Sequence, residues 1–373
     1  MKKLSRRLAG ASGLKILDLY IIGKFLGTFL FALGLIVIII VIFDAAEKID
    51  DFTELKAPLS KIIFQYYFNF VPFLINQFSG LLTFIAVIFF TSKLAYRTEI
   101  IAMLSGGVSF RRLMWPYMIS ATAIVSLSLL LNLVVIPAAN VKRVDFESKY
   151  LKMFQNGQSS SHIYRQIEQG IFVYIRGYSR LERRAEFLAI ERYDGNVLAA
   201  SCDASDAVFN PETSHWSAPK YLLRQFDSLG RETFERRERL DTLINLQAEE
   251  LGRVEELVKT MDIATLNRFI AQQRAKGSDM IDQFEVERQA RYTFPMASFI
   301  LTLMGVSLSS RKVRGGTGLH IGLGIGLCAS YILISRFAEE FAKGGLLPPY
   351  ISMWIPNLIY LAIAIYLYRK APK

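Results

Sequence analysis

The stretch FLGTFLFALGLIVIIIVIF, residues 25–43, decides the fold class of this chain. It carries no charge and approaches the ~20 residues that a helix needs to cross a hydrocarbon core. Lipid offers no hydrogen-bond partner, so the backbone of such a run must be satisfied within a helix. Five more runs without Asp, Glu, Lys or Arg follow, at residues 62–92, 113–141, 292–310, 315–335 and 344–368. The sequence therefore predicts an integral membrane α-helical protein with six transmembrane helices, three on each side of a polar insertion.

The insertion changes character along its length. Between residues 162 and 244, short alternating stretches such as IFVYI at 171–175 recur between turn signals, which predicts an antiparallel sandwich or barrel-like fold. After Asn245 the pattern becomes helical. Asp262 is the predicted N-cap of a helix that ends at Lys276, before Gly277.

The charge distribution indicates membrane topology rather than nucleic-acid binding. The net charge is +11, but residues 137–290 carry 22 basic and 24 acidic residues, whereas the rest of the chain carries 22 and 9. Basic residues dominate both termini and the connections at 93–112 and 311–314, and acidic residues dominate the loop after the first run. The positive-inside rule then places both termini in the cytoplasm and the insertion outside.

Motifs of enzyme active sites are absent from the sequence. It contains no HExxH, no GxxxxGK[ST] phosphate loop and no GxSxG elbow, and its three histidines, His162, His215 and His320, are scattered. We therefore expect no catalytic residue and no metal site in this chain.

Glycines recur on one face of two predicted spans. Small residues at this spacing let helices approach closely, which is the main packing device in lipid. The face serves either ordinary packing within the chain or a contact that slides or opens against a partner subunit. The residues are Gly23, Gly27 and Gly34 in the first span and Gly318, Gly322 and Gly326 in the fifth.

A short amphipathic helix is predicted on the cytoplasmic side, within KLAYRTEIIAMLSGGVS at residues 93–109. One face offers Ile100, Met103 and Leu104, and paired glycines end the helix. It could lie on the lipid surface. Glu99 and the small-residue end favour docking into a groove of a protein instead.

Two stretches carry a family resemblance: TEIIAMLSGGVSFRRLMWPYM at residues 98–118 and GGLLPPYISMWIPNLIYLAIAIYLYRK at 344–370. Both are similar to segments of the LptF/LptG permease family, the membrane subunits of the lipopolysaccharide export ABC transporter. The layout of three spans, an outer insertion and three further spans fits the same family. The resemblance therefore covers nearly the whole chain.

The resemblance implies partners and a location. Such a permease pairs with a paralogous or identical permease in the bacterial inner membrane, and a cytoplasmic ABC ATPase dimer grips a coupling helix of each. The ATPase uses ATP and Mg²⁺, so no cofactor is expected in this chain. The insertion, a periplasmic β-jellyroll in the family, passes lipopolysaccharide to a periplasmic bridge protein built of similar jellyrolls.

The expected domains follow from the apolar runs and the resemblance together. Each transmembrane half holds three spans, and the coupling helix lies at about 97–107. The limits are 1–137 for the N-terminal half (spans about 19–43, 62–92 and 113–137), 138–245 for the jellyroll, 246–290 for a helical connection, and 291–373 for the C-terminal half (spans about 291–310, 316–336 and 348–368).

The resemblance also implies residue roles. In the family, lipid enters through lateral gates between the first span of one permease and the fifth of the other, which gives the two glycine faces a role. Glu99 matches a position that the family uses for a polar contact to the ATPase. The predicted ATPase-docking residues are Arg97, Glu99, Ile100, Ala102, Met103, Leu104 and Gly106.

One departure from the family concerns the phosphates of the lipid. Some members carry basic residues in the outer half of the first span, whereas residues 38–43 are wholly apolar here. The candidates for phosphate contact are therefore Lys48, Lys56 and above all Arg336, which the neighbouring Glu339 and Glu340 could neutralise. Lys61 and Arg291 are expected to snorkel to the interface.

These observations predict a permease subunit that extracts lipopolysaccharide from the periplasmic leaflet of the inner membrane. One alternative is a mechanotransmission-type ABC membrane subunit that acts on another envelope lipid or on an outer partner. A membrane-bound enzyme and a passive receptor or scaffold are further alternatives.

Overall fold

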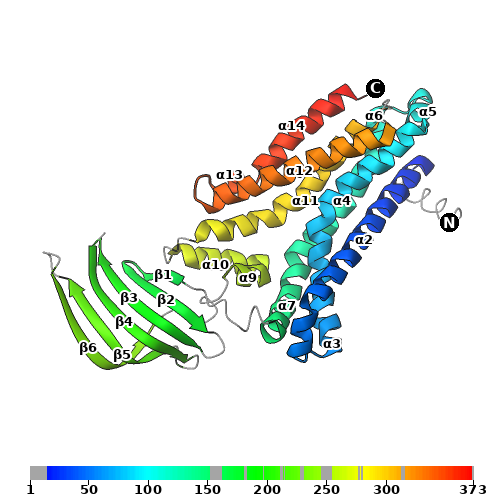
Figure 1. The fold of residues 1–373 in the computed structure, drawn as a ribbon. Coiled ribbons are helices and arrows are strands. Elements are labelled where there is room, and N and C mark those ends of the chain that lie inside the picture. The colour runs from blue at the N-terminus through cyan, green and yellow to red at the C-terminus, as the bar shows by residue number, and fades with distance from the viewer. Residues whose placement is uncertain are drawn as a thin grey trace. The chain divides into compact units, whose positions relative to one another are not determined.

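The computed structural model describes residues 15–151, 162–179, 183–195, 197–210, 215–226, 231–244, 254–275, 280–311 and 316–371, with residues 213 and 278. In this part of the chain six helical stretches are long and apolar enough to cross a membrane, which confirms the predicted helical membrane protein (Figure 1). Three precede the strands and three follow them. The stretches are Ile16–Glu54, Leu59–Tyr96, Phe110–Tyr150, Ile281–Ser309, Gly318–Lys343 and Pro349–Lys370.

The helices before the strands are longer than the apolar runs that predict them. The third span, expected at about 113–137, continues as helix to Tyr150, because helical backbone does not stop where apolar residues end. The elements are α2 (Ile16–Glu54), α3 (Leu59–Lys61), the π-helix η1 (Ile62–Tyr67), α4 (Phe68–Tyr96), α5 (Glu99–Ser105), α6 (Phe110–Leu130), the π-helix η2 (Leu131–Val135) and α7 (Ile136–Tyr150).

Pro137 accounts for the π-helical turn in the third span. Proline has no N–H to donate, and its ring crowds the carbonyl four residues earlier. That residue is Leu133, inside η2. The helix therefore widens locally instead of breaking.

The described chain divides into two compact units, and the divisions fall inside helices. The first, the helical unit, comprises Met1–Ala46, Tyr67–Ile136 and Glu285–Lys373. The second, the sheet unit, comprises Glu47–Tyr66 and Pro137–Phe284. Each is described separately below.

The helical unit has a core built by α4 and its neighbours. After the strands come α11 (Ile281–Ser309), α12 (Gly316–Lys343), α13 (Pro349–Ser352) and α14 (Ile355–Lys370). Phe84 and Ile88 of α4 are buried with Leu301, Met304 and Tyr360 from α11 and α14. On another side of α4, its residue Asn76 donates to Asn132 (2.9 Å) and accepts from Ser128 (2.5 Å). These hydrogen bonds connect α4 to the third span.

Helix α2 is attached to the helical unit along one stripe. Ile21, Phe25, Phe29 and Leu33 are buried in the core at intervals of four residues, as expected for one helical face. From residue 34 to residue 43 no side chain is buried. Ile36 and Val37 still pack partly against the same core, so the second half of this apolar run is less buried than the first but not detached from it.

The sheet unit holds a six-stranded antiparallel sheet (Figure 1). Its strands pair in sequence order, as a meander, whereas the jellyroll stays a prediction. The strands are β1 (His162–Glu168), β2 (Ile171–Ser179), β3 (Arg184–Asp194), β4 (Val197–Asn210), β5 (His215–Phe226) and β6 (Glu232–Leu243).

At one row of residues that crosses the sheet, the alternation between inward-facing and outward-facing side chains is interrupted by one extra residue. Side chains of a strand alternate with a period of two. In β2, however, the buried Ile175 is followed by Tyr178, and in β4 Ala204 is followed by Ala207. Left-handed backbone permits the slip, with φ between 57° and 65° at three of the five positions. The row consists of Gly177, Glu186, Asp206, Pro219 and Arg239, one from each of β2–β6.

Two short helices, α9 (Val254–Thr260) and α10 (Ile263–Ala275), follow the strands. Asp262 accepts from the Thr265 N–H at 3.3 Å, which confirms the predicted cap. A hydrogen bond with the Thr265 side chain, helped by this backbone contact, lowers the pKa of Asp262. Lys276 and Gly277, the predicted end of α10, lie outside the described residues.

Candidate functional site

The α5 segment, residues 97–109, has a fixed backbone shape. Helix α5 lies between two left-handed residues, Thr98 at φ 61° and Gly107 at φ 85°. Glycine adopts this conformation readily, but for a β-branched threonine it is rare. Ser109 then caps the N-terminus of α6. The connection from α4 to α6 is therefore a defined turn rather than a loose loop.

The apolar face of α5 is turned toward its own chain. Ile100 is 1% exposed in the same core as Leu113, and Met103 and Leu104 pack partly against that core. Ile100 therefore cannot contact an ATPase in this conformation. The expectation failed because regular apolar spacing predicts that a helix face is buried but does not identify what buries it. The other docking roles stay predictions. Residues exposed on this segment are Arg97, Thr98, Ile101, Ala102, Ser105, Gly106, Gly107 and Ser109.

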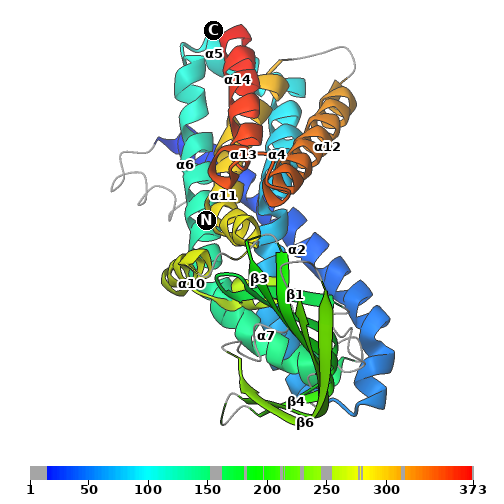
Figure 2. The same ribbon diagram turned by 90° about the vertical axis from the view of Figure 1, so that its left-hand side faces the viewer.

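Two polar contacts join the start of α2 to the α5 segment and α6. The Tyr20 hydroxyl donates to Glu99 Oε2 at 3.1 Å. The Arg112 guanidinium donates to both carboxylate oxygens of Asp18, at 2.6 and 2.5 Å. The Lys15 N–H also donates to Asp18, at 2.8 Å. The end of α14 lies at the same end of the helical unit, since the rings of Tyr368 and Phe110 are 5.7 Å apart (Figure 2).

No sequence motif marks Asp18, Tyr20 or Arg112 as functional residues. The available signal was an acidic residue just before the first apolar run, in a tail that is otherwise basic. Its partner lies 94 positions further along the chain, and a single sequence does not reveal that distance in space.

The six predicted glycines lie on exposed helix faces. A Cβ atom built on any of them meets no neighbouring atom within 4 Å. Close packing inside the chain uses other glycines: a Cβ on Gly324 would lie 2.3 Å from Ile88, and one on Gly305 would lie 2.9 Å from Val87. The six glycines therefore do not serve close packing within the described part of the chain, which leaves the contact with a partner subunit as a prediction. They are Gly23, Gly27, Gly34, Gly318, Gly322 and Gly326.

Arg336 lines a cavity of about 170 Å³ among α4, α11 and α12. Phe294, Leu301 and Ile332 give it apolar walls. Arg336 is 63% exposed and forms an ion pair with Glu339 at 3.0 Å, while Lys343 approaches the same carboxylate at 2.8 Å. Glu339 also lines the cavity, so the apolar walls are combined with an ion pair rather than with an isolated cation.

The two candidate lysines belong to the sheet unit, and Arg336 to the helical unit. Lys48 contacts the Tyr66 hydroxyl and lies 4.8 Å from the centre of the Tyr66 ring. Lys56 is exposed at a left-handed position, φ 51°. Arg291, expected to snorkel, is instead only 4% exposed in α11 and lies 3.7 Å from Glu287.

The comparison with protein families decides the class of this chain. Residues 19–370 match the model of the lipopolysaccharide export system permease LptF/LptG. The chain belongs to the LptF/LptG family. The match spans nearly the whole sequence, so it confirms the resemblance seen in the two short stretches. No curated protein matches the chain. As a member of this family, the chain is a transport component of the inner membrane and not a catalytic subunit.

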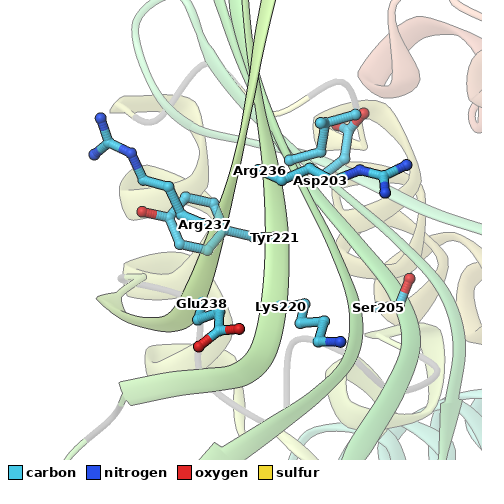
Figure 3. Close-up of a pocket in the computed structure, with 8 residues that line it drawn as sticks. Asp203, Ser205, Lys220, Tyr221, Arg236, Arg237 and Glu238 are labelled. Carbon is cyan, nitrogen blue, oxygen red and sulfur yellow. The ribbon is translucent and has the colours of Figure 1, made fainter.

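The sheet of this LptF/LptG permease carries a second, larger cavity of about 500 Å³ over β4, β5 and β6 (Figure 3). All of its lining residues except Leu222 carry polar or charged groups, and Arg237 and the ring of Tyr221 lie close together on one side (Figure 3). The lining residues are Asp203, Ser205, Lys220, Tyr221, Leu222, Arg236, Arg237 and Glu238.

Within the described part of this LptF/LptG permease, no group of three or more His, Cys, Asp or Glu side chains could hold a metal ion. His215 pairs with Asp241 at 2.8 Å and His320 is buried in α12. The side chain of His162 lies outside the described part.

Proposed function

We propose that this chain is the permease subunit of an ABC transporter that extracts lipopolysaccharide from the periplasmic leaflet of the inner membrane. A second permease, paralogous or identical, completes the membrane part. A separate cytoplasmic ATPase dimer hydrolyses ATP with Mg²⁺ and moves the α5 segment. The sheet unit then hands the lipid to a periplasmic jellyroll bridge.

The observation that carries this proposal, besides the family, is the pair of open glycine faces. A Cβ atom added to Gly23, Gly27 or Gly34 on α2, or to their counterparts on α12, would meet nothing within 4 Å among the described residues. A partner permease can therefore approach both helices closely. Lateral entry between the first span of one permease and the fifth of the other needs two such faces.

The energetics of the cargo explain why an ATPase is needed. Each CH₂ group moved out of an apolar environment costs ~0.8 kcal/mol, so a lipid with several acyl chains does not leave the bilayer unaided. The cavity beside Arg336 supports the proposal because it offers apolar walls and an exposed guanidinium, which a phosphate would have to share with or take from Glu339. Lys48 and Lys56 are further phosphate candidates in the sheet unit.

Site-specific photocrosslinking tests the path of the lipid. A photoreactive residue at Ile42 on α2 or Ile332 on α12, which are 62% and 43% exposed, should capture lipopolysaccharide in cells. Leu358 on α14, 60% exposed, is the matched control and should give weaker adducts that do not depend on ATP. Absence of lipopolysaccharide adducts at every exposed position of α2 and α12 would contradict lateral entry.

The main alternative is a mechanotransmission subunit, which acts on an outer partner without passing lipid itself. A four-span frame would suit that role better than the six candidate spans of this chain. Crosslinking to a protein partner with no lipid adduct would favour it. A membrane-bound enzyme would require activity of the purified chain without an ATPase.

A further inference from the structure

We propose that Asp18, Arg112, Tyr20 and Glu99 form a latch that makes the start of α2 move together with the α5 segment. The inference rests on the proposed function and deepens it, because it identifies positioning residues that carry motion from the ATPase side to a gate helix. The four residues are called the α2 latch below.

The ion pair is the stronger half of the α2 latch. Asp18 is 1% exposed, and its two carboxylate oxygens accept from the two terminal nitrogens of Arg112, at 2.6 and 2.5 Å. A two-pronged contact of this kind fixes orientation as well as distance. The Lys15 N–H adds a third hydrogen bond at 2.8 Å. Separating this pair would leave a buried carboxylate without its counter-charge, so α2 and α6 are held together here.

The hydrogen bond from Tyr20 to Glu99 completes the α2 latch. Glu99 is the first residue of α5, and Arg112 lies in the first turn of α6. Residues 18–20 of α2 thus contact the helices on both sides of the turn at residues 106–109. A displacement of α5 therefore acts on α2 directly through the hydrogen bond from Tyr20 to Glu99, and a displacement of α6 acts on α2 through the pair of Asp18 and Arg112.

The packing of α2 shows where such a displacement would go. The stripe from Ile21 to Leu33 is buried in the helical unit, whereas residues 34–43 have no fully buried side chain; there Ile36 and Val37 pack partly against the same core. Beyond them, Asp44 accepts a hydrogen bond from Tyr67 at 3.2 Å. The helix is therefore packed more closely near the latch than beyond Leu33. Gly23, Gly27 and Gly34 lie on the exposed face of this same helix. Motion of the latch would thus reorient the face that the proposed function assigns to the gate.

The first test measures coupling in the complete transporter, with the partner permease and ATPase in proteoliposomes. Asp18→Asn and Tyr20→Phe should lower the amount of lipopolysaccharide released per ATP hydrolysed by about fivefold or more, the lower end of typical coupling between sites. The double change Asp18→Arg with Arg112→Asp should recover part of that loss. Asp145→Asn is the control, because it removes an exposed ion pair with Lys149 on α7.

Tyr20→Phe keeps the test conclusive if Asp18→Asn misfolds. It removes one hydroxyl group from a side chain that is 39% exposed and leaves the core unchanged, so it should assemble even if Asp18→Asn does not. Normal release per ATP in assembled Tyr20→Phe and Asp18→Asn complexes would overturn the proposal.

A second readout does not depend on lipid release. A spin label at Phe31, 73% exposed on α2, should report a different mobility in the nucleotide-free and the ATP-trapped complex. Tyr20→Phe should remove most of that difference. An unchanged difference in the variant, or none in the unmodified complex, would overturn the latch. Movement of α2 in a complex that releases no lipopolysaccharide would instead refute the proposed function and leave the latch standing.

Discussion

At the scale of single residues, Glu99 illustrates what a sequence can and cannot provide. Its place in a short amphipathic helix, and the resemblance, predict a polar contact to an ATPase. The structure adds that Glu99 accepts a hydrogen bond from Tyr20 of the same chain. It also places Ile100 in the core. Apolar periodicity indicates that a face will be covered, but a covering helix of the same chain and a partner protein leave the same pattern.

Glu99→Lys should uncouple ATP hydrolysis from transport while the chain still folds. A lysine cannot accept the Tyr20 hydrogen bond, and it places a second positive charge close to Arg97 in sequence. We expect near-normal ATP hydrolysis with lipid release reduced at least fivefold, measured in proteoliposomes. Glu340→Lys, at an exposed position of α12, is the control. Normal transport by the Glu99 variant would refute the docking role.

At the scale of helices, α12 has two faces that the sequence does not distinguish. Gly318, Gly322 and Gly326 follow a spacing that predicts close helix approach, and this approach stays a prediction. However, the glycine that packs against α4 is Gly324, which lies off this stripe. Spacing identifies which glycines share a side of a helix. Which side meets a neighbour depends on how distant helices are arranged, and that information is not local.

Gly324→Leu and Gly322→Leu should therefore have different consequences. At Gly324 a new Cβ would lie 2.3 Å from Ile88, and an added isobutyl group should destabilise the chain by about 1–3 kcal/mol, seen as a lower denaturation temperature in detergent. At Gly322 a Cβ meets nothing within 4 Å, so the isolated chain should be unaffected. Pairing with the second permease should weaken instead. Equal destabilisation of the isolated chain by both changes would show that the Gly322 face packs internally.

At the scale of the whole molecule, the six spans and the strand-rich insertion could be predicted from apolar runs, because lipid enforces helices and alternation enforces strands. The order of strand pairing could not, since it depends on contacts between segments far apart in the chain. The limits of the two compact units could not be predicted from the sequence either, because they fall inside helices such as α2 and α11.

Cysteine labelling tests the predicted orientation. In a chain with Cys202→Ser and Cys328→Ser, a thiol at Ser205 in the sheet should react with a membrane-impermeant maleimide added from outside. A thiol at Ser105 in the α5 segment should react only after the inner membrane is opened. The native Cys202 is a poor probe, because burial and the nearby Asp203 raise the pKa of its thiol to about 11. Labelling of Ser105→Cys from outside would invert the topology and remove the ATPase from reach.

The row from Gly177 to Arg239 constrains how the sheet can change. The pairing register of neighbouring strands from β2 to β6 is the same on both sides of this row, so their inward sides still match beyond it. Deletion of Asp206 alone would reverse the side-chain orientation along one end of β4, so that its apolar side chains would face water and its charged side chains would face the interior. An insertion or deletion at this row in one strand is therefore expected to require a matching change in the neighbouring strands. The row thus restricts stepwise, one-residue changes in strand length.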